Sequence, residues 1–367
     1  MMAANKGSGR TEKRMENRRL VLGAIDIGGT KIASGLVSTS GQVLYRAQIE
    51  TPVAGGKEAA EAVASLALQL QTEAGKRKFE LGAVGLCVPG LVNPASGLVW
   101  APNIKGWKNV KLLPWLQKKV DCPLSAVSDR TAYVEGEAWR GAARGKKNVI
   151  YLAVGTGIGA GLMVDGHVIH GQSDLAGAAG WLALNPEFKP AYKKVGCFEA
   201  EAGGRALYQK SKEFIQKQPE VLLSPQPRHF GTVENPVEFL CEAARAGQME
   251  AVKVVGEIQK YLAMGVANLV SLFNPEMIVL GGGLFKSADL FFEPVKKKFK
   301  LWAQPLAAEE VEIVLSSLGQ EAALLGCARS ALMLLKDRDE IDKGRKKAIA
   351  RKRISANNNN KFKKIKN

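Results

Sequence analysis

Two short glycine-rich segments contain the residues whose types and spacing best suit chemistry. One is DIGGTK at 26–31 and the other is GTGIG at 155–159, and each includes a threonine. Glycine lets backbone N–H groups approach phosphate oxygens because no Cβ intervenes, and a threonine hydroxyl adds a further hydrogen bond. A single such turn can serve a hairpin for conformational reasons alone. Two of them, followed by GGG at 281–283, favour nucleotide binding.

Two aspartates lie where apolar segments end, at positions suited to phosphoryl transfer. Asp26 ends the run LVLGAIDI, where a carboxylate could hold Mg²⁺ through water; the alternative is a turn-capping aspartate. Asp129 follows LSAV and precedes a helical segment, so it could accept the proton of a hydroxyl that attacks a γ-phosphate. The alternative is that Ser128 or Asp129 only caps that helix. Lys31 could face phosphate or solvent equally well.

The chain around each glycine turn follows the same order of expected elements. Residues 20–50 predict a strand, a glycine turn, a strand, a second turn and a strand, and residues 149–169 repeat this plan. The repeat distance of about 128 residues is too long for a solenoid and suits a duplicated domain. The order of elements therefore predicts two related halves.

The remaining periodicity adds helices and further strands to each half. Helical spacing covers 57–75, 237–273 with a break at 246–248, and 320–335, while 81–88 and 276–280 predict strands. Mixed elements about a duplicated meander predict an α/β protein of two domains with a cleft between them. We expect the domains at 20–145 and 146–335, with the last helix a candidate for packing back on the first domain.

The net charge is concentrated at the two ends of the chain. Of the +17 carried by 367 residues, residues 1–19 contribute +4 and residues 336–367 contribute +9, which leaves +4 for 20–335. Both tails are polar and lack helical apolar spacing, so we expect them to be disordered. A solubilising role is favoured over polyanion binding, because Phe362 is the only aromatic residue in the C-terminal tail.

Cysteine usage and hydropathy point to the cytoplasm. The five cysteines are dispersed without a CxxC pair, which favours reduced thiols over disulfides or a zinc knuckle. The N-terminus lacks the apolar core of an export signal, and no stretch approaches the 18 or so apolar residues of a membrane span. With 46% hydrophobic and 24% charged residues the chain is typical of a globular protein without a membrane partner.

Together these segments resemble the ROK family of sugar kinases and sugar-responsive repressors, over about residues 20–335. The resemblance implies the actin/hexokinase-like (ribonuclease H-like) ATPase fold, ATP and Mg²⁺ as cofactors, a small sugar as substrate and a homodimer. The matching segments are DIGGTK (26–31), VPGLVNPASGLVWAPNIKGW (88–107), SDRTAYVEGEAWRGAARG (128–145), GTGIGAGLMVDG (155–166), GCFEAEAGG (196–204), NPEMIVLGGGL (274–284) and LGQEAALLGCA (318–328).

The resemblance also implies roles for individual residues. Asp129 would be the general base, and Asp26 would hold Mg²⁺ through water. ATP would be bound by Asp26, Gly28, Gly29, Thr30, Lys31, Gly155, Thr156, Gly157 and Gly159, with Gly282 and Gly283 on the adenosine side. The sugar would contact Gly90, Asn103, Ser128, Trp181 and Glu199.

The chain departs from the family at the sugar and zinc positions. The family's NDAN is SDRT here, and its AGEIGH is AGAAGW, so Ala178 replaces a sugar-binding glutamate and Trp181 replaces a histidine that binds sugar and zinc. Of the zinc cysteines only Cys197 is left, so we expect no zinc. Trp181 would stack on a sugar ring or pack in the core. We expect 181–196 to be ordered by packing of Trp181, Leu182, Leu184, Phe188 and Tyr192.

Two functions of different classes remain open at this point. The first is an ATP- and Mg²⁺-dependent kinase for a hexose or amino-sugar hydroxyl, because both phosphate turns and Asp129 are present. The alternative is a non-catalytic sugar or nucleotide sensor, which the missing glutamate and histidine favour. We do not expect a DNA-binding repressor, because the roughly 19 residues before the first strand leave no room for a helix-turn-helix. Glu135 and Glu137 could replace the missing glutamate, but we expect them on a solvated helix face.

Overall fold

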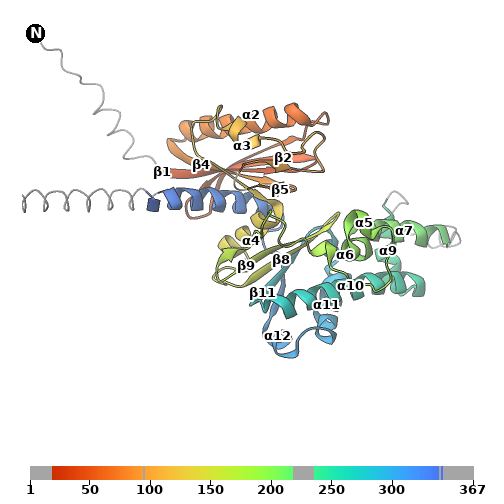
Figure 1. Ribbon diagram of the computed structural model, residues 1–367. Helices are drawn as coiled ribbons and strands as arrows, with labels where there is room; N and C mark the ends of the chain where they lie inside the picture. Colours follow the sequence, from red (N-terminus) through yellow and green to blue (C-terminus); the bar gives the residue numbers. More distant parts are fainter. Residues whose placement is uncertain (1–18, 94–95, 218–234, 339, 342–367) are drawn as a thin grey trace, which may run out of the picture. The chain divides into compact units, whose positions relative to one another are not determined.

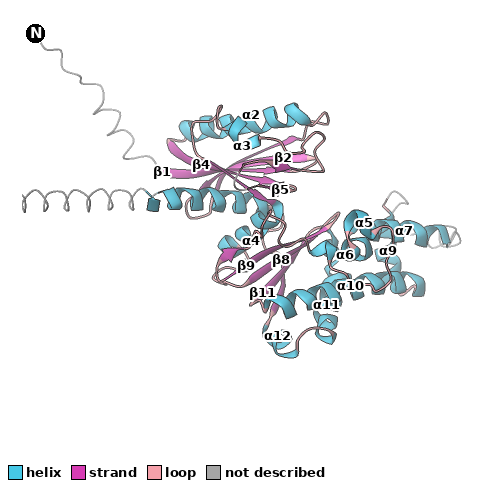
Figure 2. Ribbon diagram, in the orientation of Figure 1, coloured by secondary structure: helices cyan, strands magenta, loops and turns pink. Residues whose placement is uncertain are grey.

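The chain forms two compact units that are not contiguous in sequence. The computed structural model describes residues 19–93, 96–217, 235–338 and 340–341. The first unit comprises Met1–Pro89, Ser96–Val127 and Cys327–Asn367, and the second comprises Gly90–Ala95 and Ser128–Gly326. Figure 1 labels the elements, and Figure 2 shows that each unit combines strands with helices.

A five-stranded sheet organises the first unit. Its strand order is β3-β2-β1-β4-β7, in which β1 is antiparallel to β2, β2 is antiparallel to β3, and β1 is parallel to β4. The strands are β1 (Arg19–Ile27), β2 (Lys31–Ser38), β3 (Val43–Glu50), β4 (Phe79–Val88) and β7 (Leu124–Ser128). The central strands are apolar along their length because both faces of the sheet are covered.

Helices cover both faces of this sheet. On one face, Leu70 of α2 (Gly56–Lys76) lies beside Gly23, where an added Cβ would be 3.3 Å from Leu70 Cδ1. On the other face, a Cβ at Gly85 would lie 1.9 Å from the carbonyl oxygen of Cys327, in the helical segment 321–338. Gly85 pairs with Ala24, the neighbour of Gly23, so the two helices are on opposite faces. The first unit also contains β6 (Val99–Trp100) and α3 (Leu112–Leu116).

A second five-stranded sheet repeats the plan in the second unit. Its order is β10-β9-β8-β11-β12; β8 is antiparallel to β9 and β11 is parallel to both β8 and β12. The strands are β8 (Val149–Val154), β9 (Ile158–Val164), β10 (His167–Val168), β11 (Met277–Gly281) and β12 (Glu312–Leu315). The two sheets share one strand order, and the first four strands of each, counted from β3 and from β10, run in corresponding directions, as expected for a duplicated plan.

Alternation along β8 divides the core of the second unit between two layers of helices. Ile150 and Leu152 belong to a cluster with Phe198 and the buried face of α10. Val149 and Tyr151 belong to another, with Val134 of α4 (Asp129–Arg140). The other elements are β5 (Leu91–Val92), η1 (Ala179–Trp181), α5 (Tyr192–Val195), α6 (Cys197–Ala202), α7 (Gly204–Lys217), α9 (Pro236–Arg245), α10 (Met249–Phe273), η2 (Gly283–Ser287), α11 (Ala288–Lys298), η3 (Phe299–Leu301) and α12 (Pro305–Glu310).

The division between the units falls at Ser128, earlier than the boundary expected at 145. Helix α4 packs against β8 and β9, and a Cβ at Gly161 of β9 would lie 2.1 Å from the backbone oxygen of Arg130 in α4. The helix is therefore part of the second unit. Residues 327–338 belong to the first unit, where Cys327 Sγ donates to the carbonyl of Ile25 at 3.4 Å.

The basic tails lie mostly outside the described residues. Of 1–19, only Arg19 is described, and it is the first residue of β1, where it pairs with Phe79. Of 336–367, residues 336–338 and 340–341 are described, and all are helical. Disorder was therefore wrong for these few positions, because strand pairing and the last helix extend into the segments that polarity alone marked as tails.

Glu137 contradicts the expectation of a solvated helix face. The residue is 0% exposed, and its carboxylate accepts hydrogen bonds from Ser316 Oγ at 2.5 Å and from the backbone N–H groups of Ala142 at 2.7 Å and Leu318 at 3.2 Å. Buried carboxylates are tolerated when they are bonded in this way. Glu137 therefore ties the end of α4 to the segment after β12.

All five cysteines are free thiols, and four of them are buried. Across the described ranges, no helix combines the length and the apolar character needed to cross a membrane.

Candidate active site

The first glycine turn is fixed by hydrogen bonds from its own unit. Gly28 N–H donates to the carbonyl of Lys31 at 2.9 Å, which closes the turn between β1 and β2. Thr51, just after β3, donates its hydroxyl to the Gly28 carbonyl at 2.7 Å and its N–H to the Thr30 carbonyl at 2.8 Å. Gly29 and Thr30 are left exposed at the tip. Thr51 was missed by sequence reasoning, and no local motif distinguishes it.

Asp26 lies at the base of this turn, where burial disfavours the ionised form of its carboxyl. Burial raises the pKa of its carboxyl above the ordinary value of 3.8, although a hydrogen bond with Cys87 and the nearby charge of Lys31 both oppose the rise. Cys87 is the partner of Asp26 across the parallel pair β1–β4. A partly desolvated carboxylate of this kind is suited to a cation, which would restore the interactions that burial removes.

The predicted sugar residue Asn103 lies beside the first turn. A Cβ at Gly29 would be 3.3 Å from Asn103 Cβ, so glycine is the residue that fits here. The loop that carries Asn103 is closed on itself by Ala101 N–H to the Trp107 carbonyl at 2.8 Å. Trp107 is buried and donates its Nε1–H to the Gly56 carbonyl at 2.9 Å. Asn103 is therefore an exposed side chain on an ordered loop.

Asp129 is the first residue of α4, and its neighbour Ser128 caps the helix. Ser128 Oγ accepts the N–H of Thr131 at 3.4 Å and lies 3.2 Å from Thr131 Oγ1. Ser128 is 2% exposed and its hydroxyl bonds within the cap, so we do not include Ser128 among the residues that contact the sugar. Asp129 is half-buried, and one carboxylate oxygen accepts the N–H of Arg130 at 2.9 Å. The cap and the predicted base are therefore different residues.

The second glycine turn, between β8 and β9, is fixed by the start of α7. Gly155 N–H donates to the Gly157 carbonyl at 3.0 Å within the turn. The N–H groups of Gly204 and Arg205 donate to the carbonyls of Gly155 at 2.8 Å and Thr156 at 3.2 Å. Thr156 is exposed, and a Cβ at Gly155 would meet nothing within 4 Å. The turn therefore has open space beside it.

Glu199 of α6 lies directly against the second turn. Its Oε2 accepts the N–H of Ile158 at 2.8 Å, and a Cβ at Gly157 would be 2.4 Å from the same oxygen. A Cβ at Gly180 would be 3.0 Å from Glu199 Cβ. Burial raises the pKa of the Glu199 carboxyl, although the Ile158 hydrogen bond and the charge of Arg205 oppose the rise. Glu199 thus joins the phosphate turn to the run AGAAGW.

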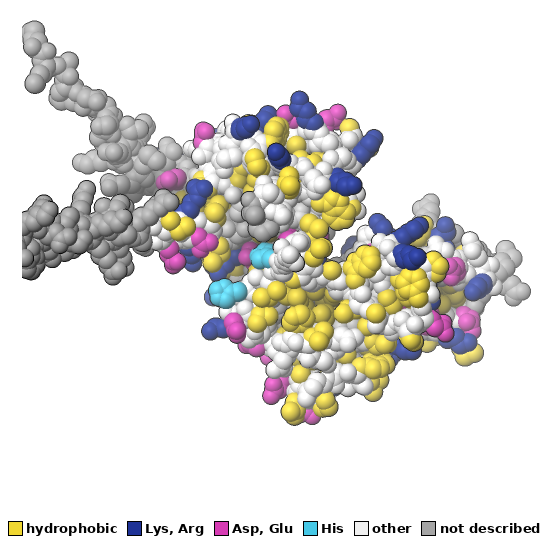
Figure 3. All heavy atoms as spheres, viewed as in Figure 1, with side chains coloured by type: hydrophobic (Ala, Val, Ile, Leu, Met, Phe, Trp, Pro, Cys, Tyr) yellow, Lys and Arg dark blue, Asp and Glu magenta, His cyan; other side chains and the backbone are white. Residues whose placement is uncertain are grey.

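The segment 181–196 is ordered differently from the expectation. Leu184 and Tyr192 are buried, and Phe188, although 65% exposed, packs edge-on against Tyr192 with ring centroids 5.9 Å apart. Trp181 is 58% exposed, so core packing was wrong for this residue. Stacking of Trp181 on a sugar stays a prediction. Figure 3 shows hydrophobic side chains on the surface of the second unit, to which Trp181 and Phe188 belong.

A buried polar network replaces the missing packing of Trp181. Tyr192 donates its hydroxyl to Glu201 of α6 and accepts from Asn185 Nδ2 at 2.9 Å. Lys189 Nζ pairs with Glu201 Oε1 at 2.5 Å, and Lys210 Nζ lies 3.9 Å from Oε2. Burial opposes ionisation of Glu201, but the hydrogen bonds from Lys189 and Tyr192 outweigh it and the pKa is lowered. Sequence reasoning missed this network, although its members lie within 26 residues of one another, because no regular spacing marks them.

The remaining predicted positions also lie in the second unit. Gly282 has φ 103°, and a Cβ there would be 2.4 Å from the Val154 carbonyl, so the chain needs glycine where it passes the end of β8. At Gly283 a Cβ would meet nothing within 4 Å. Gly90 is half-buried and opens the short segment Gly90–Ala95. The structure therefore places Gly282 beside the second phosphate turn, because Val154 immediately precedes Gly155.

Both glycine turns expose small residues, as the predicted binding of phosphate requires. Each follows a buried strand and presents exposed small residues, with Gly29 and Thr30 in one and Thr156 in the other. No group of three or more His, Cys, Asp or Glu placed for a metal ion occurs within the described part of the chain. The absence of zinc stays a prediction.

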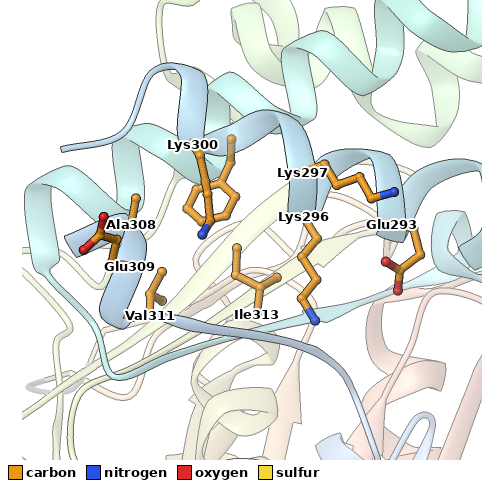
Figure 4. A pocket seen from close by; sticks show the side chains of 9 residues that line it. Glu293, Lys296, Lys297, Lys300, Ala308, Glu309, Val311 and Ile313 are labelled. Carbon is orange, nitrogen blue, oxygen red and sulfur yellow. The ribbon is translucent and has the colours of Figure 1, made fainter. Parts of the chain in front are cut away.

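A separate groove on the second unit is not part of this site (Figure 4). Its volume is about 470 Å³, and its rim carries lysines of α11 and η3 above an apolar floor. None of the predicted site residues lines it. The lining residues are Glu293, Lys296, Lys297, Phe299, Lys300, Ala308, Glu309, Val311 and Ile313.

Comparison with known proteins gives one consistent result. The model of the ROK family matches residues 22–334. The glucokinase of Thermotoga maritima is 31% identical over 314 residues, which cover 84% of this chain and 96% of that protein. Xylose repressors match as well; that of Bacillus subtilis is 26% identical over 70% of this chain and 62% of the repressor.

Two solved structures share the fold. A ROK hexokinase from Thermus thermophilus has a TM-score of 0.74 and 31% identity, and the match covers 86% of this chain and 99% of that chain. A ROK family glucokinase from Streptomyces griseus, solved with glucose and AMPPNP, has a TM-score of 0.69 and 28% identity, over 85% and 99% of the two chains. These are kinases of the actin/hexokinase-like fold, so the predicted fold class is confirmed.

Proposed function

The chain belongs to the ROK family, and on that premise we propose that it transfers the γ-phosphoryl group of ATP to a hydroxyl of a hexose or amino sugar. One observation carries the proposal. Asp129 precedes Arg130, whose side chain lies against Gly159, where an added Cβ would be 3.0 Å from Arg130 Cδ. The predicted base and the second phosphate turn are therefore neighbours on one unit.

The chemistry requires a proton acceptor and charge stabilisation. The sugar hydroxyl oxygen forms a bond to the γ-phosphorus, the bond to the β-phosphate oxygen breaks, and the hydroxyl proton passes to the Asp129 carboxylate. Exposed backbone N–H groups of the glycine turns stabilise the phosphate charge. Similarity to a glucokinase solved with AMPPNP supports ATP as the donor. When bound, Mg²⁺ would neutralise phosphate charge, and Asp26 would hold it through water.

Each unit by itself carries a side chain that supports a sugar as acceptor, although neither identifies the sugar. In the second unit Glu199 is fixed beside the run AGAAGW by its bond to Ile158 N–H, and in the first unit Asn103 is exposed on an ordered loop. Carboxylate and amide groups are suited to hydroxyl recognition. The side chain of Ala178 cannot form a hydrogen bond, so we propose a changed sugar preference relative to the glucokinases, with Trp181 available to stack on a ring face.

The test is a coupled assay of ADP release with ATP and Mg²⁺ over glucose, mannose, fructose, allose, N-acetylglucosamine and N-acetylmannosamine. Asp129→Asn should lower kcat by at least about 100-fold, because proton acceptance is lost. Ser128, not Asp129, caps α4, so this variant should fold. Asp165→Asn is the control, because Asp165 is exposed in the β9–β10 turn and asparagine also tolerates its φ of 51°. Normal turnover by Asp129→Asn would refute the assignment of the base.

The replacement of a family glutamate by Ala178 keeps the non-catalytic sensor as a second candidate. Xylose repressors among the similar proteins are members named for regulation and not for catalysis. The sensor predicts that nucleotide or sugar binds by calorimetry while no sugar in the panel supports ADP release. A homodimer in the cytoplasm remains part of the proposal, and sedimentation would test the dimer.

A further inference from the structure

Asp174 is a buried carboxylate with a left-handed backbone conformation. It lies in the loop between β10 and η1, has φ 56° and is 5% exposed. Left-handed φ values disfavour residues other than glycine, asparagine and aspartate, and a buried carboxylate is unfavourable unless its oxygens are bonded. The hydrogen bonds of the Asp174 carboxylate therefore decide whether its burial is tolerated.

Three hydrogen bonds connect Asp174 to three segments of the second unit. Its Oδ2 accepts the backbone N–H of Val92 at 3.2 Å. Its Oδ1 lies 2.9 Å from Nδ1 of His170, in its own loop. Its main-chain carbonyl accepts from Arg130 Nη2 of α4 at 2.9 Å. One residue thus joins the segment Gly90–Ala95, the loop before η1 and the start of the helix that carries Asp129.

Each of these segments carries a residue of the proposed acceptor site. Val92 follows Gly90 by two positions, and Arg130 directly follows Asp129. The Asp174 loop continues into Gly177, whose carbonyl accepts the N–H of Ala160 in β9 at 2.7 Å, and then into Ala178 and the 3-10 turn that ends at Trp181. The loop is therefore held to α4 and the Gly90 segment at one end and to the second phosphate strand at the other.

We propose that Asp174 is a positioning residue that sets the geometry of the acceptor side of the site. It acts through Val92, Arg130 and its own loop, and it does not itself touch the sugar. The inference rests on the proposed function. It assigns to Asp174 a role in the binding of the acceptor and none in the binding of ATP, whose glycine turns are held by Thr51, Gly204 and Arg205.

The pairing with His170 supports this role. The hydrogen bond that the imidazole makes to the Asp174 carboxylate raises the pKa of His170, which burial opposes, while the charges of Asp174 and Glu135 add to the rise. An imidazolium beside the carboxylate strengthens their contact, because charge-assisted hydrogen bonds are stronger than neutral ones. The arrangement keeps the carboxylate oriented toward Val92.

The test compares Asp174→Gly with Asp165→Gly. Glycine accepts the left-handed backbone at both positions, since φ is 56° at Asp174 and 51° at Asp165, so each variant removes a carboxylate without adding strain. Asp165 is exposed in the β9–β10 turn and serves as the control. For Asp174→Gly we expect KM for the sugar to rise about tenfold or more with KM for ATP unchanged, and faster amide exchange in residues 90–93. For Asp165→Gly we expect neither change.

Two results would overturn the inference. One is a sugar KM within about twofold of the unsubstituted chain, even if exchange at 90–93 becomes faster, because the contact would then be structural only. The other is an equal rise of both KM values, which would indicate a general loss of structure.

Sugar affinity measured by calorimetry separates this inference from the proposed function. A chain that binds a sugar without phosphorylating it fails the proposed function, while weaker binding by Asp174→Gly still supports the positioning role and unchanged binding overturns it. A chain that neither binds nor phosphorylates any sugar overturns both.

Discussion

The carboxylate of Glu199 accepts the backbone N–H of Ile158 at 2.8 Å, and it occupies the space that a side chain at Gly157 would need. A predicted sugar residue is therefore bonded to the turn that is expected to hold phosphate. The contact between Glu199 and the second glycine turn is therefore common to both predicted sites, so a change to this contact should affect the binding of both substrates.

Gly157→Ala tests the contact between Glu199 and the second glycine turn. Its Cβ would be 2.4 Å from Glu199 Oε2, so the carboxylate must move and its bond to Ile158 N–H should weaken. We expect kcat/KM for the sugar to fall by about 10- to 100-fold, in line with the loss of one hydrogen bond to a charged group. Steady-state kinetics with each substrate varied would check it, and an unaltered kcat/KM would contradict the close approach.

Two glycines of α10 should respond oppositely to alanine. Gly256→Ala adds a Cβ that meets nothing within 4 Å and should stabilise the fold by about 0.5–1 kcal/mol through helix propensity. Gly265→Ala places its Cβ 2.3 Å from the Phe198 ring of α6 and should destabilise by about 1–3 kcal/mol. Urea unfolding of both variants gives the comparison. Equal effects of one sign would mean that α6 and α10 are not packed as described.

Asp26→Asn should raise the thermal stability of the chain and lower its activity. Burial raises the pKa of Asp26 above 3.8, so the ionised carboxyl destabilises the folded chain, and folding stability improves as the pH falls through the folded pKa. The asparagine variant should unfold at a higher temperature than the unsubstituted chain at pH 7, while turnover with ATP and Mg²⁺ falls by about 100-fold or more. Thermal unfolding without ligands beside the coupled assay measures both. A lower melting temperature at pH 7 would refute the argument.

Glu201→Gln and Tyr192→Phe should loosen the segment 181–196. The lowered pKa of Glu201 means that its contribution is present above the ordinary value of 4.5 and is lost as the pH falls through the folded pKa. At pH 7 we expect a loss of about 1–3 kcal/mol for Glu201→Gln and faster tryptic cleavage at Lys193 and Lys194. The difference from the unsubstituted chain should shrink at low pH. Cleavage at an unchanged rate in both variants would show that the network does not order the segment.

Ala178→Glu should restore a hydrogen-bonding group to the acceptor side. Ala178 is half-buried and precedes the 3-10 turn that contains Gly180, the neighbour of Glu199. If the site has only lost one contact, KM for glucose should fall by about ten- to a hundredfold with KM for ATP unchanged. If KM is unaltered, recognition depends on Trp181, and Trp181→Ala should then raise KM for the preferred sugar.

Local patterns were sufficient for much of the fold. The apolar runs that end in glycine turns predicted β1 to β3 and β8 to β10, and the break at 246–248 separates α9 from α10, because strand alternation and helix periodicity are properties of neighbouring residues. The position of Asp129 at the start of a helix also followed from the sequence. The structure was needed to show that Ser128, and not Asp129, caps this helix.

Tertiary partners were not predictable in this way. Thr51 and Asp174 bond to groups that are distant in sequence, and no residue type or spacing marks them. Exposure of single aromatic side chains was also missed: Trp181 and Phe188 belong to an apolar stretch but lie on the surface, while the polar Glu137 is wholly buried. Burial depends on what packs above a residue, which the local pattern does not contain.

The first unit is complete only after the last helix of the described chain has been synthesised. This order affects folding on the ribosome. Cys327 Sγ bonds to the carbonyl of Ile25, and Ser330 Oγ lies 3.0 Å from Ser125 Oγ. Residues 128–326 are made in between, which takes roughly 10–40 s at about 5–20 residues per second. During this time the face of β4 at Gly85 is without its cover. A nascent chain halted before residue 327 should therefore bind chaperones through that face and release them once the helix emerges.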